Sequence, residues 1–214
     1  MKFRKIMVCL LVLATVAGAA NAPASDGYSI FNLGFGGQYW NAKDIDDFDT
    51  DGMWGGNIIL RIRPIKYLGI DVRGGYGGNW DGESYRYDGR KYETDVTFQC
   101  VPVEAGLVLM LPIGDVFTLY GGPGAGYYWY NININKHSTR HGHHYRKEYD
   151  DDIKLEDDFG WYALVGANFQ LAPHFSIFGE ARYTDTDTKL KHVDNAPKID
   201  CSGVGFQVGL MFDF

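Results

Sequence analysis

The stretch that decides the fold is residues 101–129, VPVEAGLVLMLPIGDVFTLYGGPGAGYYW. Apolar side chains occupy every second position from Val101 to Leu109, and again from Phe117 to Trp129 with small residues interspersed. Alternation with a period of two is typical of a strand with one apolar and one polar face. The intervening LPIGD contains proline and glycine, which favour a tight turn. We therefore predict two antiparallel strands joined by a short turn.

The same alternation recurs on both sides of this hairpin. It predicts six more strands, over residues 31–39, 54–63, 68–76, 161–171, 175–183 and 204–214. Three of the seven connections are short and contain proline: RPIKY, LPIGD and LAPH. The other four are long and polar: Asn41 to Gly52, Asn79 to Glu93, Asn131 to Asp158, and Asp185 to Asp200. Strict alternation of long and short connections is typical of outer-membrane barrels, whose long loops face outside. The predicted fold is an all-β, eight-stranded antiparallel up-and-down transmembrane β-barrel.

The alternative is a soluble eight-stranded barrel such as a lipocalin, with apolar residues inside. Periodicity alone leaves open which face is inside. The polar face here is rich in glycine, which suits a narrow lumen, and aromatic residues gather near the strand ends of the apolar face, as membrane girdles do. We therefore expect the apolar face to contact lipid.

The first residues have the three parts of a secretory signal peptide: a basic start, an apolar run, and small residues. We predict a signal peptide at 1–24 and a barrel at 25–214, exported through the periplasm to the bacterial outer membrane. The net charge of −7 becomes more acidic when the basic start is removed, which argues against nucleic-acid binding. We expect a monomer.

Particular strings resemble the small outer-membrane barrels typified by the OmpA transmembrane domain and OmpX. They are the hairpin quoted above, HFSIFGEARYTDT (174–186) and the closing SGVGFQVGLMFDF (202–214). The resemblance implies an outer-membrane location among lipid and lipopolysaccharide. It also implies that Leu210, Phe212 and Phe214 form the signal that the barrel-assembly machinery reads.

Seven charged residues share the inward parity. They are Arg61, Arg63, Asp71, Arg73, Glu104, Glu180 and Arg182. The interior of an eight-stranded barrel is just wide enough to be filled by side chains, and buried charges must be paired. We therefore predict an ion-pair network that plugs the lumen. The alternative is a gated channel in which the pairs exchange partners.

Two polar segments are candidate metal sites. One carries His137, His141, His143 and His144, and imidazoles at this density can bind zinc or copper. The other, DFDTDG, places Asp47, Asp49 and Asp51 like the start of a calcium loop, but the twelfth position is Ile58 instead of Glu. Weak metal binding and a solvated loop both stay open, and no cofactor is predicted.

We expect no enzymatic activity. His174 and Ser176 resemble the H-x-S pair of lipid A deacylase barrels, but they lie beside a short turn and the following Asn is replaced by Ile177. Cys100 and Cys201 belong to opposite strands, so we expect thiols, because a disulfide requires Cα atoms about 5.5 Å apart.

Two functions fit these observations. The first is a structural or surface-interaction protein that binds an unknown extracellular ligand through its long loops. The second is a narrow pore or a small-ligand transport barrel.

Overall fold

The computed structural model describes residues 29–43, 52–87, 90–140, 143–189, 191 and 198–214, without the side chains of 80–96 and 133–154. The predicted signal peptide and the acidic segment with Asp47, Asp49 and Asp51 lie outside the described residues. Among the described residues, no helix is long and apolar enough to cross a membrane.

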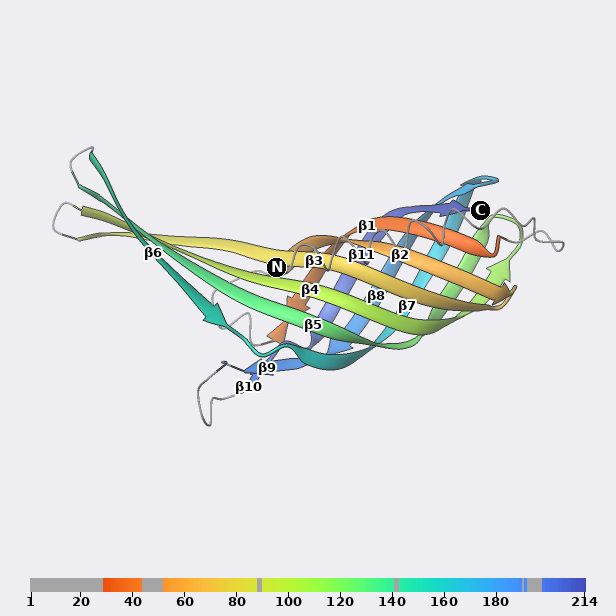
Figure 1. Ribbon diagram of the computed structural model, residues 1–214. Coiled ribbons are helices and arrows are strands. Elements are labelled where there is room, and N and C mark those ends of the chain that lie inside the picture. The colour runs from red at the N-terminus through yellow and green to blue at the C-terminus, as the bar shows by residue number, and fades with distance from the viewer. Residues whose placement is uncertain (1–28, 44–51, 88–89, 141–142, 190, 192–197) are drawn as a thin grey trace.

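Eight strands form a closed antiparallel barrel, which confirms the predicted fold (Figure 1). They are β1 (Phe31–Ala42), β2 (Met53–Ile65), β3 (Leu68–Tyr87), β4 (Arg90–Ile113), β5 (Phe117–Arg140), β7 (Asp158–Ala172), β8 (Phe175–Asp185) and β11 (Gly203–Asp213). Each pairs with its neighbours in the chain, β1 pairs with β11, and β4 with β5, so the barrel closes. Two short strands, β9 (Asp187–Lys189) and β10 (Lys198–Asp200), form a separate ribbon.

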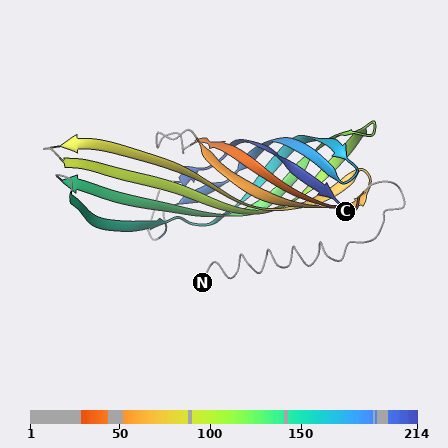
Figure 2. The ribbon, with the colours of Figure 1, turned by 90° about the horizontal axis from the view of Figure 1, so that it is seen from above.

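The three short turns connect β2 to β3, β4 to β5 and β7 to β8, and they lie at the end of the barrel where the chain terminates (Figure 2). Gly114 in the middle turn has a φ of 68°. A side chain with a Cβ rarely adopts this left-handed conformation, so glycine suits the turn. Short turns are periplasmic in outer-membrane barrels, so we call this end the periplasmic end and the opposite end the external end.

Two of the predicted loops, Asn79 to Glu93 and Asn131 to Asp158, are mostly strand, which corrects the prediction of four loops. β3, β4 and β5 continue past the barrel and are joined by β6 (His143–Lys154) in a four-stranded sheet (Figures 1 and 2). The cause is visible in the sequence. Ile132 and Ile134 keep a period of two on the inward face that Tyr130 also occupies, and an Asp-Gly dipeptide at 88–89 is a strong hairpin signal.

The apolar face of the barrel points outward. Val208, Leu109 and Phe159 are 71%, 69% and 65% exposed, whereas Arg61 and Asp71 on the opposite face have no exposure. Pairs of aromatic rings lie at the external end of this apolar band, among them Tyr39–Trp54 and Trp161–Tyr183. A large exposed apolar surface over a polar interior is the reverse of a soluble barrel and suits lipid. The lipocalin alternative is therefore excluded.

Candidate functional site in the barrel lumen

The centre of the lumen holds a first group of buried charges from three strands. The Arg61 guanidinium on β2 binds both carboxylate oxygens of Asp71 on β3, at 2.7 and 2.9 Å. Arg73 Nη2 lies 2.7 Å from Asp71 Oδ2, and Arg73 also binds both oxygens of Glu180 on β8, at 2.5 and 2.8 Å. The Tyr120 hydroxyl donates to Glu180 at 3.0 Å. These bonds connect opposite walls of the barrel.

A second group lies beside the first. Arg182 Nη1 is 2.6 Å from Glu104 Oε2, and the Tyr128 hydroxyl donates to Glu104 Oε1 at 2.8 Å. The Tyr162 ring lies between the groups, 6.0 Å from the Arg73 guanidinium carbon and 5.5 Å from that of Arg182. Cations within about 6 Å of an aromatic face are attracted to it. Together the two groups hold three arginines and three carboxylates. We call them the central charged layer, which consists of Arg61, Asp71, Arg73, Glu104, Glu180 and Arg182 with Tyr120, Tyr128 and Tyr162.

The structure places the seventh predicted residue, Arg63, elsewhere. Arg63 is only partly buried at the periplasmic end, and its guanidinium donates to the Lys66 carbonyl at 3.1 Å. Arg63 shares the inward parity but is two residues closer to the turn than Arg61. It therefore stands apart from the central charged layer.

Neutral amides adjoin the charges. Asn57 Nδ2 donates to Gln38 at 3.1 Å and to Gln207 at 2.7 Å, and Gln207 donates back to Asn57. A cavity of about 10 Å³ is lined by two of these amides, Gln38 and Gln207, and by Glu180 and Arg182. This volume is close to the minimum for a single water molecule.

Apolar side chains fill the lumen beside the charges. In one buried cluster Val108, Met110 and Leu164 pack with Tyr120 and Tyr162 of the central charged layer, and Ile59, Phe178 and Met211 form another. The members other than the two tyrosines were not among the predicted lumen residues, because apolar side chains are expected on the lipid face of such a barrel. Each of these residues has the inward parity of its strand, and this parity could have identified it as a lumen residue.

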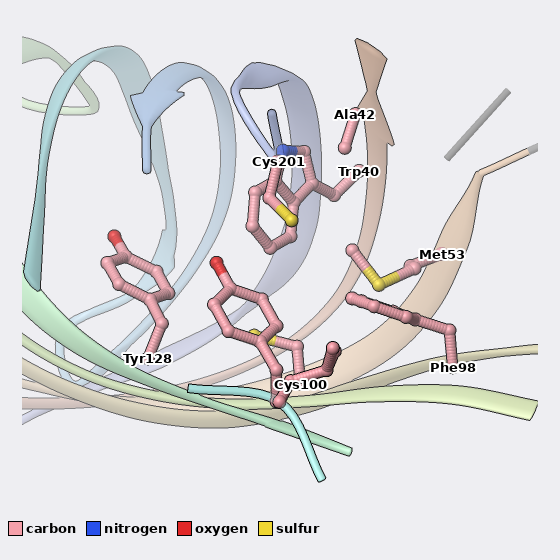
Figure 3. Packing of buried hydrophobic residues seen from close by; sticks show 9 residues of the cluster. Trp40, Ala42, Met53, Phe98, Cys100, Tyr128 and Cys201 are labelled. Carbon is pink, nitrogen blue, oxygen red and sulfur yellow. The ribbon is translucent and has the colours of Figure 1, made fainter. Parts of the chain in front are cut away.

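The external end is closed by a third buried cluster, which we call the outer cap. It consists of Trp40, Ala42, Met53, Phe98, Cys100, Tyr128, Tyr130, Leu155 and Cys201 (Figure 3). Leu155 and Cys201 lie outside the barrel strands, in segments that fold over the mouth. Trp40 and Tyr128 pack with ring centroids 6.2 Å apart, and Phe98 and Tyr130 at 5.7 Å.

Hydrogen bonds tie the covering segments to each other and to the wall. The Tyr130 hydroxyl donates to Thr186 Oγ1 at 3.2 Å, and the Cys201 N–H donates to the Thr186 carbonyl at 3.0 Å. The Ser202 N–H donates to Asp200 Oδ1 at 2.9 Å. Hydrogen bonds from Ser202 hold the pKa of the Asp200 carboxyl below its usual value.

Glycines make room for the large lumen side chains. A Cβ on Gly124 would lie 2.2 Å from Tyr162 Cζ, and one on Gly166 would lie 2.6 Å from Tyr120 Cζ. Both distances are far below van der Waals contact. The glycine-rich polar face therefore accommodates the aromatic rings that contact the charges.

The remaining predicted residues lie elsewhere. Leu210, Phe212 and Phe214 are on the exposed apolar face at the end of the chain, where the Phe214 N–H donates to the Phe31 carbonyl at 2.9 Å. His137 lies on β5 and His143 and His144 on β6, all beyond the barrel; their side chains and the whole of His141 are outside the described residues. No group of three or more metal-binding His, Cys, Asp or Glu occurs within the described part of the chain.

The H-x-S pair is divided between two environments. Ser176 is buried, whereas His174 is exposed at the turn with its Nδ1 3.1 Å from the Asp213 carbonyl oxygen. Cys100 and Cys201 are not joined to each other in this structure. Cys100 and Cys201 belong to opposite sides of the barrel, yet their side chains are part of one cluster. Their positions on opposite strands did not predict this shared cluster.

A lipid-facing barrel with a polar, side-chain-filled lumen defines the class of outer-membrane β-barrels. Residues 9–214 match the family model described as outer membrane protein beta-barrel domain, and the chain belongs to that family. The protein is located in the bacterial outer membrane.

Several solved structures resemble this chain at low identity. A major outer membrane protein of Thermus thermophilus is 14% identical, with 86% of this chain and 98% of that chain covered and a TM-score of 0.50. Neisserial surface protein A is 15% identical, with coverages of 87% and 98% and a TM-score of 0.49. Ail, the attachment invasion locus protein of Yersinia pestis, in complex with the heparin analogue sucrose octasulfate, is 16% identical, with coverages of 86% and 96% and a TM-score of 0.46. No curated protein matches the sequence.

Proposed function

We propose that this protein is a non-enzymatic structural or surface-interaction protein whose lumen is closed to solutes. The central charged layer carries this proposal. Its three arginines and three carboxylates are at most 10% exposed and are bound to one another across the lumen. Because the charges balance, the layer requires no mobile counter-ion. Removing one partner of such a pair leaves a buried charge, which is strongly unfavourable.

The external sheet supports the surface role. Within the described residues, β3 from Trp80 to Tyr87 pairs only with β4, and β6 pairs only with β5. Both outer strands thus offer backbone donors and acceptors along one edge. An added strand is a common way for a sheet edge to bind an extended peptide. We propose an extended segment of an extracellular protein as the ligand.

Planar-bilayer conductance of the refolded protein tests the closed lumen. The parent should show no stable single-channel steps, because its lumen is filled. Glu104→Ala and Glu180→Ala, which each remove one carboxylate, are the comparison variants. Steady ohmic steps from the parent would overturn the proposal and favour the narrow pore.

Labelling of intact cells tests the surface role. A membrane-impermeant maleimide should label Ser84→Cys on the external sheet and leave Lys66→Cys in a short turn unlabelled. The parent is the background control because its Cys100 and Cys201 are buried. Labelling of Lys66→Cys alone would reverse the topology and exclude the external sheet as a binding surface.

We also propose that Leu210, Phe212 and Phe214 are read by the barrel-assembly machinery. Their support is the alternation of β11 toward an aromatic carboxyl-terminal residue. Deleting Phe214 should slow membrane assembly, measured as the fraction of heat-modifiable barrel in the outer membrane. Normal assembly of the truncated chain would contradict the proposal.

A further inference from the structure

Two cysteine side chains from opposite sides of the barrel belong to the outer cap. Cys100 on β4 and Cys201 beside β11 are 1% and 0% exposed, and both belong to the same apolar cluster. β4 and β11 lie four strands apart in a ring of eight. Figure 3 shows both side chains directed into the interior of the cap.

Tyr130 connects the surroundings of the two cysteines. It is directly opposite Cys100 in the pairing of β4 and β5. Its hydroxyl crosses to Thr186, whose carbonyl accepts the Cys201 N–H.

The position of Cys201 in the chain permits a closer approach. A disulfide requires Cα atoms about 4.4–6.8 Å apart, less than the usual width of a barrel. Cys201 follows β10, which ends at Asp200, and precedes β11, which begins at Gly203. It is therefore outside the barrel ladder, so closing the bond requires a shift of residues 201–202 and not of a paired strand.

We propose that Cys100 and Cys201 form an intramolecular disulfide across the external mouth of the lumen. The two thiols lose two protons and two electrons as the S–S bond forms. A dithiol-oxidase disulfide of the periplasm accepts the electrons through a mixed disulfide and leaves as two thiols. Since both sulfurs are buried in the closed barrel, this exchange takes place while the chain crosses the periplasm, an oxidising compartment. The bond holds residues 198–202 over the mouth.

Thiol counting on the exported protein from native outer membranes, after removal of the predicted signal peptide with its Cys9, tests the proposal. Thiols are trapped with acid, the protein is unfolded, and a maleimide of high mass is added with or without prior reduction. The parent should gain no maleimide without reduction and two after it. Cys100→Ser and Cys201→Ser should each gain one under both conditions. Two maleimides on the unreduced parent, or one, would overturn the proposal.

A second measurement tests whether the disulfide stabilises the outer cap. The temperature at which the folded gel band converts to the unfolded one should fall when the parent is reduced. The same temperature should not change on reduction of Cys100→Ser, which is the matched control. An equal response of both proteins, or no response of the parent, would contradict a disulfide that holds the cap.

Discussion

The central charged layer and the outer cap both close the lumen, but they are built differently. Every member of the charged layer lies on a barrel strand, so the ladder fixes its height and direction. The outer cap recruits Leu155 and Cys201 from segments outside the barrel strands. The layer is thus stabilised by the barrel as a whole, whereas the cap also depends on local hydrogen bonds. Changes in the layer should affect global unfolding more than changes in the cap.

The largest effect is expected for Glu180→Ala. The substitution removes both bonds of Arg73 to Glu180 and leaves it to share Asp71 with Arg61, in a lumen where the Arg73 side chain is 1% exposed. Breaking a buried pair in this way costs about 3–5 kcal/mol. Urea unfolding of the barrel in lipid vesicles measures the loss. Val208→Ala on the lipid face is the control and should change stability much less; equal losses would contradict the distinct role of the layer.

The next effect concerns the space for Tyr162 between the two charged groups. In Gly124→Ala the new methyl group would lie 2.2 Å from the Tyr162 ring, so ring or strand must shift. Overpacking of this kind costs about 1–3 kcal/mol. The matched control is Gly37→Ala on the lipid face, where the nearest atom is 4.0 Å away. Comparable unfolding midpoints for both variants would show that the ring moves without cost.

The difference between the two regions also explains what the sequence could predict. The alternation of each strand identified Arg61, Asp71, Arg73, Glu104, Glu180 and Arg182 as inward, because side-chain direction has a period of two. It did not reveal which acid binds which arginine, since that depends on the stagger of strands across the lumen. Arg63 has the same parity as Arg61, but its height at the barrel end removes it from the layer.

The outer cap was not predictable in the same way. Leu155 and Cys201 have no barrel-strand register, so parity cannot place them. The external sheet was missed for a different reason. Its segments are rich in polar residues, which favour a loop, and Ile132 and Ile134 lie on the opposite face to the apolar residues Tyr127 and Trp129. Strands form there because the backbone pairing of β3, β4 and β5 continues beyond the barrel, and not because apolar side chains are buried.

A smaller effect is expected for Tyr130→Phe in the outer cap. The substitution keeps the ring that packs on Phe98 and removes the hydrogen bond to Thr186. The net loss for such a bond is about 0.5–1.5 kcal/mol. Hydrogen exchange should accelerate at residues 186–189 and 198–202 and remain unchanged in the charged layer. Uniform acceleration through the barrel would show that cap and layer open together.

The smallest effect is a pH dependence confined to the cap. Hydrogen bonds from Ser202 lower the pKa of Asp200 below the ordinary value of 3.8. A carboxyl group with a lowered pKa stabilises the folded form at pH above its unfolded pKa. That contribution is lost as the pH falls from about 3.8 through the folded pKa, when protonation weakens the bond to the Ser202 N–H. Hydrogen exchange at 200–202, compared at pH 6 and pH 3 after correction for the intrinsic rate, measures the change. Asp200→Asn should remove most of the difference, whereas an undiminished pH response in that variant would assign it to the neighbouring carboxyls Asp158 and Asp187.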